Sequence, residues 1–431
     1  MSVKLTVLFA PINYVGPILA SAGMGEVLRD SGHRVIFAVR SEWSQRLKSL
    51  SFEVELLAEG SGDGKDDSAA ENAEELESVL QNKSPLEKGI ECSALLLKDC
   101  MVDADKDESA LKGIIKRIKP DVIITDHVIT LPSVAGSGIP WIFSYSSNPL
   151  SLDVGYEDKR LPPSLLGLSI NSDQNLWEEY RQQLKESRRE NWIKYKEWLV
   201  ANDCPVLPEE CLCWAPSPFA NIYMFPEELD YTDVRPLPKT FHRFDYFKRT
   251  GDEETFELPD KLKSRSGKLI YLSLGSMGGA NVPLMKRLVS ILAKSEHRFI
   301  ISKGVKHNEY ELADNMWGER TVPQVKVLSI VSLIITHGGN NTVTETMYFG
   351  KPMLVLPLFY DQYDNAQRID EKGFGIRLNP YECTDEQLLS AIDRLLDDRK
   401  LAQKLAKVSH RIRTEKSIEK LTQLVESLAK K

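Results

Sequence analysis

The sequence predicts two α/β domains in tandem, each built on a doubly wound parallel sheet. Three observations support this fold class. The chain has 431 residues, which is more than a single hydrophobic core usually serves. Short β-branched runs alternate with helix-like stretches over residues 1–150, as in a parallel sheet. The same alternation begins again at residue 269, after an irregular stretch rich in proline.

The first domain is expected over residues 1–240. An apolar run at residues 5–10 predicts a buried first strand, and residues 18–29 predict the first helix. The acidic, small-residue stretch at residues 59–77 predicts a mobile loop that leads into a helix. Residues 173–202 predict a long surface helix whose tryptophan and tyrosine side chains face the core. Further strands are expected at residues 34–39, 121–125 and 141–145.

A linker is expected over residues 241–265, where polar, aromatic and acidic residues follow one another. The second domain is expected over residues 266–408, beginning with a strand at 269–274. A last helix is expected at residues 409–431. Its place beyond the last strand signal allows it to cross back onto the first domain.

Composition and charge argue against several classes of function. The 55 basic and 63 acidic residues give a formal net charge of −8, which argues against nucleic acid or an anionic membrane as a partner. The six cysteines and seven histidines show no metal-ligand spacing, so we expect no metal. The first apolar run is too short for a secretion signal, and no stretch approaches the roughly 18 apolar residues of a membrane span. We therefore expect a cytoplasmic protein with no membrane span and no bound cofactor.

Polar groups follow three predicted strands of the second half, at the ends where open α/β sheets bind ligands. Asn341 and Thr342 begin a helix, whose free N–H groups and positive dipole end attract phosphate. Glu345, one turn further on, is placed to accept from two ribose hydroxyls. The constellation predicts a site for a nucleoside diphosphate that carries a polyol, and no GxxxxGK[ST] phosphate loop is present. The groups at the strand ends are Gly275-Ser276, His337-Gly338-Gly339 and Asp361-Gln362.

A longer pattern contains these residues: Pro323-Gln324, Thr336-His337-Gly338-Gly339, Asn341-Thr342, Glu345, Pro352, Pro357 and Asp361-Gln362. It resembles the signature of the family 1 UDP-glycosyltransferases, whose GT-B fold has two Rossmann-like domains facing a cleft. The resemblance implies inverting transfer of a sugar from a UDP-sugar to a small lipophilic acceptor, such as a phenolic or a xenobiotic. The final glutamine of the pattern suggests glucose, so UDP-glucose is the expected co-substrate.

The resemblance also implies roles for the matching residues. Gln324 would hold uracil, and Glu345 would hold the ribose. Plant members stack a tryptophan on uracil three residues before the glutamine, where this chain has Thr321. The phosphates would be held by Ser276, His337, Asn341 and Thr342, and the sugar by Asp361 and Gln362. Gly275 and Gly339 would also belong to the donor-binding site.

A catalytic histidine just after the first strand, oriented by an aspartate at a later strand end, is also implied. The aspartate matches Asp126, the last residue of PDVIITD. Counting back from the strand entry at residues 32–35 places the histidine position at Pro17, and no histidine precedes His33. An alternative alignment places Tyr14 there. Because proline is favoured at the first helical position, Pro17 is expected to begin the first helix.

Three hypotheses stay open for the reaction. The chain transfers sugar with a substitute base, for which Asp126 and the adjacent His127 are candidates, although neighbouring side chains of a strand point to opposite faces. Alternatively, it uses acceptors that need little help, such as acidic phenols or nitrogen or sulfur nucleophiles. In the third hypothesis it binds a UDP-sugar or an apolar ligand with weak or no transfer.

Overall fold

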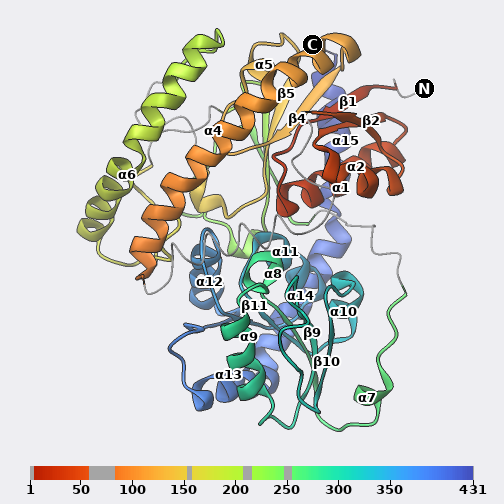
Figure 1. The fold of residues 1–431 in the computed structure, drawn as a ribbon, viewed down its shortest axis with the longest axis vertical. Helices are drawn as coiled ribbons and strands as arrows, with labels where there is room; N and C mark the ends of the chain where they lie inside the picture. Colours follow the sequence, from red (N-terminus) through yellow and green to blue (C-terminus); the bar gives the residue numbers. More distant parts are fainter. Residues whose placement is uncertain (1–3, 58–82, 153–157, 207–215, 247–254, 431) are drawn as a thin grey trace.

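The computed structural model describes residues 4–57, 83–152, 158–206, 216–246 and 255–430. Two α/β domains lie end to end, each with one parallel sheet covered by helices (Figure 1). The predicted fold class is therefore confirmed. The loop expected at residues 59–77 lies outside the described residues.

The first sheet has seven parallel strands in the order β3-β2-β1-β4-β5-β6-β7. Their side chains are mostly buried because helices cover both faces of the sheet. The four predicted strands are present, within one residue at each end. Residues 241–244, placed in the expected linker, form the seventh strand. The strands are β1 Thr6–Phe9, β2 Arg34–Val39, β3 Glu53–Leu56, β4 Val122–Asp126, β5 Trp141–Tyr145, β6 Ala220–Met224 and β7 Phe241–Phe244.

The helices of the first domain include two long ones, which pack against each other on one flank of the sheet (Figure 1). The longer of these is α4. The other, α6, is the helix predicted at residues 173–202, and it buries Trp177, Trp192 and Tyr195 as expected. The helices are α1 Val15–Asp30, α2 Ser41–Ser49, α4 Pro85–Ile118, α5 Pro132–Ala135 and α6 Gln174–Ala201, with short 3-10 turns at Pro149–Ser151 and Glu227–Leu229.

The expected start of the first helix was wrong. Helix α1 begins at Val15, so Pro17 is its third residue and not its first. Proline is tolerated there because the first four N–H groups of a helix have no partner within it.

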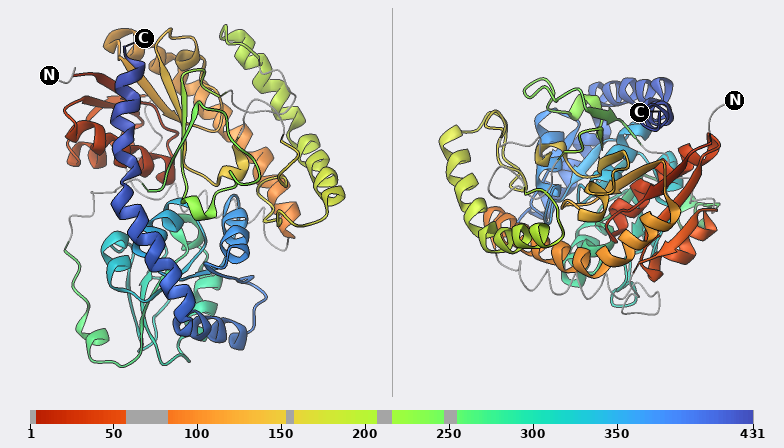
Figure 2. Two further views of the ribbon diagram at one scale, coloured as in Figure 1. Left: turned by 180° about the vertical axis from the view of Figure 1, so that it is seen from behind. Right: turned by 90° about the horizontal axis from the view of Figure 1, so that it is seen from above.

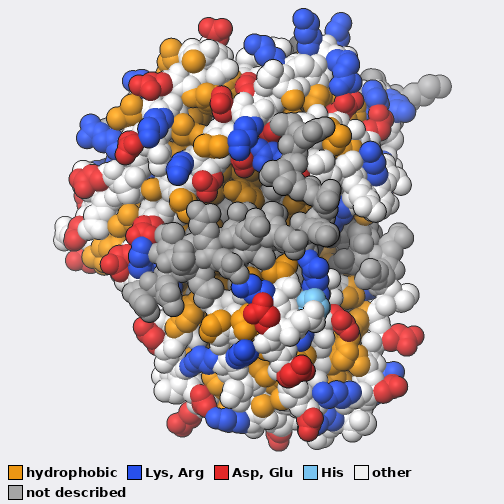
Figure 3. Space-filling view, in the orientation of Figure 1, with side chains coloured by type: hydrophobic (Ala, Val, Ile, Leu, Met, Phe, Trp, Pro, Cys, Tyr) orange, Lys and Arg blue, Asp and Glu red, His pale blue; other side chains and the backbone are white. Residues whose placement is uncertain are grey.

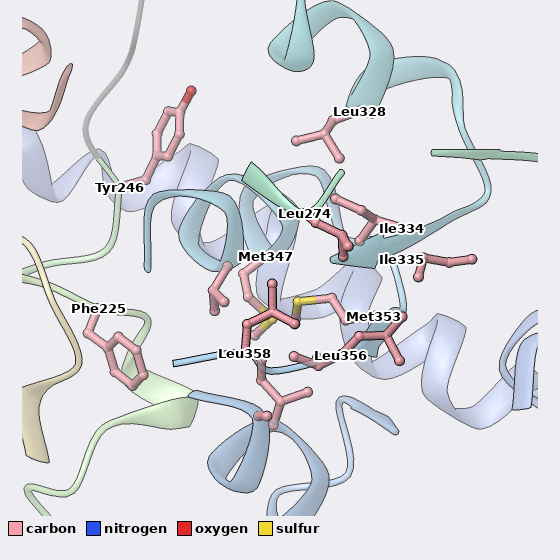
Figure 4. Close-up of a cluster of buried hydrophobic side chains, with 14 of the residues drawn as sticks. Phe225, Tyr246, Leu274, Leu328, Ile334, Ile335, Met347, Met353, Leu356 and Leu358 are labelled. Carbon is pink, nitrogen blue, oxygen red and sulfur yellow. The ribbon is translucent and has the colours of Figure 1, made fainter. Parts of the chain in front are cut away.

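The second sheet has six parallel strands in the order β10-β9-β8-β11-β12-β13. Apolar side chains of β11, β12 and the helix α11 pack together in one buried cluster (Figure 4). The strands are β8 Leu269–Ser273, β9 Arg298–Ser302, β10 Met316–Glu319, β11 Leu333–Thr336, β12 Met353–Val355 and β13 Gly375–Arg377. The helices are α7 Asp260–Lys263, α8 Gly275–Gly278, α9 Val282–Leu292, α10 Gln324–Ile330, α11 Asn340–Phe349, α12 Gln362–Glu371 and α13 Asp385–Asp397.

The C-terminal segment crosses from the second domain to the first. Helix α14 (Arg399–Glu415) packs on α11, and α15 (Lys420–Leu428) packs on α1. Between them the chain bends at Lys416, whose φ is 43°, and makes a 3-10 turn at Ser417–Glu419. The two helices run along the back of both domains (Figure 2, left).

Acidic and basic side chains are intermixed over the face of the molecule in Figure 3. Within the described ranges, no helix combines the length and the apolar character that crossing a membrane requires.

Candidate functional site

The carboxyl ends of β8 and β11 bring a histidine and two glycines together. A Cβ on Gly275 would lie 2.8 Å from the His337 ring, and a Cβ on Gly339 would lie 2.5 Å from it. Gly275 also has a φ of 73°, which side chains rarely allow. Burial lowers the pKa of His337 to about 4, although a hydrogen bond with the Ser273 backbone opposes this shift. The imidazole is therefore neutral at physiological pH and can donate one N–H to a ligand.

The start of α11 provides further donors beside this histidine. Its capping residue Gly339 offers no side chain, so the first N–H groups of the helix remain available to an anion. Nδ2 of Asn341 donates to the Gly16 carbonyl of the first domain at 3.0 Å, and Nδ2 of Asn340 donates to the Met224 carbonyl at 3.0 Å. Ser276, which is exposed, follows Gly275 as the second residue of α8. The helix end is thus held at the boundary between the domains, where it can bind phosphate.

The residues expected at the nucleoside end form one hydrogen-bonded cluster. Nε2 of Gln324 donates to Glu345 at 2.7 Å and to Oγ1 of Thr342 at 3.2 Å. The Tyr271 hydroxyl donates to Oε1 of Gln324 at 3.3 Å. Tyr271 was not predicted from the sequence, where its only signal is a hydroxyl within the apolar run at residues 269–272. Glu345 is buried, with 2% of its surface exposed.

The position that carries tryptophan in plant members has no aromatic side chain in this chain. Thr321 is exposed, in the loop between β10 and α10. The nearby Trp317 packs on Phe256, with ring centroids 5.9 Å apart.

The two residues expected to hold the sugar lie at the start of α12. Oε1 of Gln362 accepts from the N–H groups of Leu358 and Phe359 at 3.0 and 3.2 Å, which orients the amide so that its Nε2 can donate to a ligand. Oδ2 of Asp361 accepts from Ser147 Oγ at 2.8 Å and from the Asn148 N–H at 3.1 Å. Burial raises the pKa of Asp361, and the Ser147 hydrogen bond opposes that shift.

The contacts of Ser147 and Asn148 with Asp361 were not predicted from the sequence. Both residues belong to the polar run at residues 144–148, which leaves β5 of the first domain. Their partner Asp361 lies in the other domain, so no local pattern connects them.

The candidate base Asp126 ends β4 in the first domain. Its Oδ2 accepts from Ser144 Oγ at 3.4 Å. Burial raises the pKa of Asp126 to about 7, against hydrogen bonds from Ser146 and Ser144 that favour the ionised form. A carboxyl group with this pKa exchanges its proton near neutral pH.

The second candidate, His127, lies on the opposite face of the sheet. It lines a small cavity with Asp107 and Glu108 of α4. Its Nδ1 accepts from the Ile129 N–H at 3.4 Å. Burial, assisted by the charge of Arg40, lowers the pKa of His127 to about 3. The structure therefore separates the two candidates, as the alternation along a strand requires.

Helical periodicity puts Pro17 on the same face of α1 as Met24, which contacts a hydrogen-bond partner of Asp126. Ser21 and Met24 follow Pro17 by one and two helical turns on the same face. The Met24 sulfur is 4.0 Å from Ser144 Oγ, and this hydroxyl donates to Asp126. The face of α1 that carries Pro17 is thus linked to Asp126 through Met24 and Ser144.

Tyr14, the alternative to Pro17, caps the start of α1. Burial and the nearby Cys100, Asp103 and Asp99 raise its pKa, and Arg40 opposes this. Since three of these neighbours belong to α4, Tyr14 faces α4.

Comparison with known proteins finds a family match that lies in the second domain. Residues 255–425 match the family described as "UDP-glucoronosyl and UDP-glucosyl transferase". The chain is 30% identical over 166 residues to the NDP-glycosyltransferase YjiC of Bacillus subtilis (strain 168), which covers 38% of this chain and 42% of that protein. It is also 30% identical over 165 residues to human UDP-glucuronosyltransferase 1A6, covering 38% of this chain and 31% of the relative. The match therefore spans less than half the length of these relatives.

The fold is similar to solved structures over nearly the whole chain. The glycotransferase of kitacinnamycin superposes with a TM-score of 0.72 at 18% identity, covering 99% of this chain and 100% of that one. CalG4, the calicheamicin glycosyltransferase, gives a TM-score of 0.68 at 16% identity, covering 99% and 98%. Residues 255–425 are thus similar to the UDP-glucuronosyl and UDP-glucosyl transferase family, and the two domains have the GT-B fold of the solved glycosyltransferase structures.

Proposed function

We propose that the protein transfers a sugar from a nucleoside diphosphate sugar to a small lipophilic acceptor, with inversion at the anomeric carbon. The observation that carries this proposal is the grouping of the donor residues. Gln324, Thr342 and Glu345 form one cluster, and His337 stands beside the uncapped start of α11. The named activities of the relatives support the same chemistry.

The donor is proposed to be UDP-glucose. The uncapped N–H groups of α11 and the neutral His337 would bind the diphosphate, and the carboxylate of Glu345 would accept from the ribose hydroxyls. Nε2 of Gln362 would donate to a sugar hydroxyl, and Asp361 would accept from another. Direct comparison of UDP-glucose with other nucleotide sugars tests this choice.

Thymidine diphosphate is the alternative nucleotide. Thr321 stands where plant members stack a tryptophan on uracil, so uracil would lose that contact. The solved structure of VinC, with a TM-score of 0.66 and 15% identity over 98% of this chain and 100% of that one, is described as a complex with dTDP. Titrating UDP and dTDP separately into the protein distinguishes the two donors.

Asp126 is proposed as the base. The acceptor oxygen would attack the anomeric carbon from the side opposite the diphosphate, and its proton would pass to the Asp126 carboxylate. The bond between the anomeric carbon and the diphosphate oxygen breaks, and the nucleoside diphosphate leaves with the electron pair. His337 and the start of α11 would stabilise that charge. A carboxyl pKa of about 7 suits a base that works near neutral pH.

The acceptor is proposed to be apolar because of the side chains at the domain boundary. Buried Cys92 of α4 packs with Leu95, Met277, Phe359 and Tyr360, which come from both domains. A phenolic or similar flat compound matches this apolar and aromatic surface.

UDP release from UDP-glucose, measured with a panel of phenols, alcohols and thiols, tests the proposal. We expect acceptor-dependent release by the wild type, a loss of about 10²–10⁴-fold in Asp126→Asn, and little change in His127→Ala. A wild type that binds UDP but releases none with any acceptor would favour a second function. Pro17 fills the histidine position, so that outcome would indicate a protein that binds a nucleotide sugar without transfer.

A further inference from the structure

Helix α12 connects the sugar residues to the first domain through a buried carboxylate. Asp364 has 1% of its surface exposed. Its Oδ2 accepts from the Leu165 N–H at 2.6 Å, and its Oδ1 accepts from the Gly167 N–H at 2.9 Å. Both donors belong to residues 161–170 of the first domain, which we call the clasp loop. One buried carboxyl group of the second domain therefore accepts hydrogen bonds from two backbone amides of the first.

The backbone of the clasp loop is shaped for this contact. Leu165 and Gly167 have φ values of 72° and 61°, a region that costs energy for residues other than glycine. A Cβ on Gly167 would lie 2.7 Å from the Tyr363 carbonyl and 2.9 Å from Nη1 of Arg377. Nη1 of Arg377 donates to the Gly167 carbonyl at 2.9 Å. Only a glycine fits between the loop and α12 at this point.

The other side of the clasp loop rests on α4. A Cβ on Gly89 would lie 2.6 Å from Cδ2 of Leu166 and 3.1 Å from the Leu165 carbonyl. Leu166 is buried, with 4% of its surface exposed. Further along the loop, Ser169 donates to Glu371 at the end of α12. The clasp loop thus fills the space between α4 of the first domain and α12 of the second.

We propose that Asp364 is a positioning residue that sets how closely the two domains approach each other at the sugar site. Asp361 and Gln362 precede Asp364 by less than one turn, so a shift of α12 moves them with it. Transfer needs the acceptor oxygen within about 3–3.5 Å of the anomeric carbon, and a displacement of about 1 Å costs up to roughly 100-fold in rate. The effect on transfer rests on the proposed function. The contact between Asp364 and the clasp loop can be tested even if the protein transfers no sugar.

Two variants loosen the clasp from opposite domains. Asp364→Asn removes one of the two acceptor atoms, and Gly167→Ala inserts a methyl group against the Tyr363 carbonyl. The matched controls are Asp397→Asn, an exposed carboxyl at the end of α13, and Gly113→Ala, a helical glycine with nothing within 4 Å of a Cβ. Should one clasp variant fail to fold, the other still reports on the proposal.

The first measurement is hydrogen exchange at the Leu165 and Gly167 amides, together with small-angle scattering. We expect about 10-fold faster exchange in both clasp variants, a larger radius of gyration, and no change in the controls. Unchanged exchange or an unchanged radius overturns the proposal. This arm stands even if the wild type transfers no sugar, an outcome that would refute the proposed function alone.

The second measurement separates positioning from a loss of folding. We expect about a 10-fold lower kcat in each clasp variant, a UDP dissociation constant within about 2-fold of the wild type, and a double variant no worse than the single ones. Transfer at the wild-type rate despite faster exchange overturns the positioning role. So does a parallel loss of UDP binding, because that would show a general role in holding the second domain together.

Discussion

Ser144 Oγ donates to Oδ2 of Asp126 at 3.4 Å, and this aspartate is the one that the family resemblance pairs with a catalytic histidine. A hydroxyl is a weaker partner than an imidazolium, so it leaves the carboxyl with a pKa raised by burial. The same aspartate that would orient a histidine is thereby able to accept a proton itself.

Restoring the histidine should change the reaction. In Pro17→His the new imidazole would lie on the face of α1 that is linked to Asp126 through Met24 and Ser144, and it can take the acceptor proton while the carboxylate stabilises the imidazolium. We expect kcat/KM for an aliphatic alcohol to rise by about 10²-fold or more, with less gain for an acidic phenol. Initial rates with both acceptors measure this. Pro17→Ala is the control, because it removes the proline without adding a base; equal gains in both variants would contradict the prediction.

The pH profile should report the ionisation of Asp126. A base works when ionised, so kcat/KM should rise about tenfold per pH unit below pH 7 and level off above it, because burial raises the pKa of Asp126 to about 7. Rates from pH 5 to 9 with one phenol acceptor measure this rise of kcat/KM with pH, which forms the acidic limb of the profile. The limb should be absent from the residual activity of Asp126→Asn, and an unchanged limb there would assign it to another group.

The raised pKa of Asp126 also predicts how stability depends on pH. Activity should rise with pH, whereas the contribution of Asp126 to stability should fall. Since the folded pKa of Asp126 is raised, its contribution to stability is fully present below the unfolded pKa of about 3.9 and is lost as pH rises through about 7. Asp126→Asn, which carries no charge, should therefore raise the Tm at pH 8 and change it less at pH 5. Melting curves at the two pH values test this, and a Tm that falls equally at both would show that the carboxylate is well solvated.

The second domain was easier to predict from the sequence than the first, for a physical reason. Its donor residues lie on strand ends and helix starts that follow one another closely, so a local pattern identifies them. The contacts that complete the site join distant segments: Ser147 and Asp361 are 214 positions apart. The strand at residues 241–244 is short and partly exposed, so its sequence carries little strand signal. It is recognised as a strand in the structure because it pairs with β6. Helix α1 begins at Val15, before Pro17. Because proline is tolerated anywhere in the first turn of a helix, Pro17 alone does not fix the residue at which the helix begins.

Replacing Glu345, the residue proposed to bind the ribose, should selectively weaken recognition of the ribose hydroxyls. Glu345 accepts from Gln324, and its carboxylate is the proposed acceptor for the ribose hydroxyls. In Glu345→Gln we expect UDP to bind about 10-fold more weakly, because a neutral amide replaces a charged acceptor. The loss should be smaller for 2′-deoxyuridine diphosphate. Calorimetric titration of both nucleotides measures the difference, with the exposed Glu386→Gln on α13 as control. Equal losses for the two nucleotides would place Glu345 away from the 2′-hydroxyl.

The crossing of the C-terminal helices predicts where the two domains are joined most firmly. Arg411 of α14 donates to both oxygens of Glu228 at 2.8 Å, and to Asp245 at 2.7 and 3.2 Å. Asp245 has 1% of its surface exposed. Burial alone would raise the pKa of Asp245, but Arg411 and Arg243 outweigh it and hold the pKa below its usual range. The carboxylate thus stabilises the fold above the unfolded pKa of about 3.9, and this contribution is lost as pH falls further.

Removing this arginine should destabilise the protein without abolishing UDP binding. In Arg411→Ala a buried carboxylate loses one of two cationic partners, so we expect the free energy of unfolding to fall by about 2–3 kcal/mol. The loss should be largest near neutral pH and shrink below about pH 4, where Asp245 is protonated in the unfolded chain. Urea denaturation at pH 7 and at about pH 3, below the unfolded pKa of about 3.9, measures it, with the exposed Arg399→Ala at the start of α14 as control. A loss below about 0.5 kcal/mol at pH 7, the size expected for a solvated surface pair, would mean that the domains are joined mainly by the apolar packing of α14 on α11 and α15 on α1.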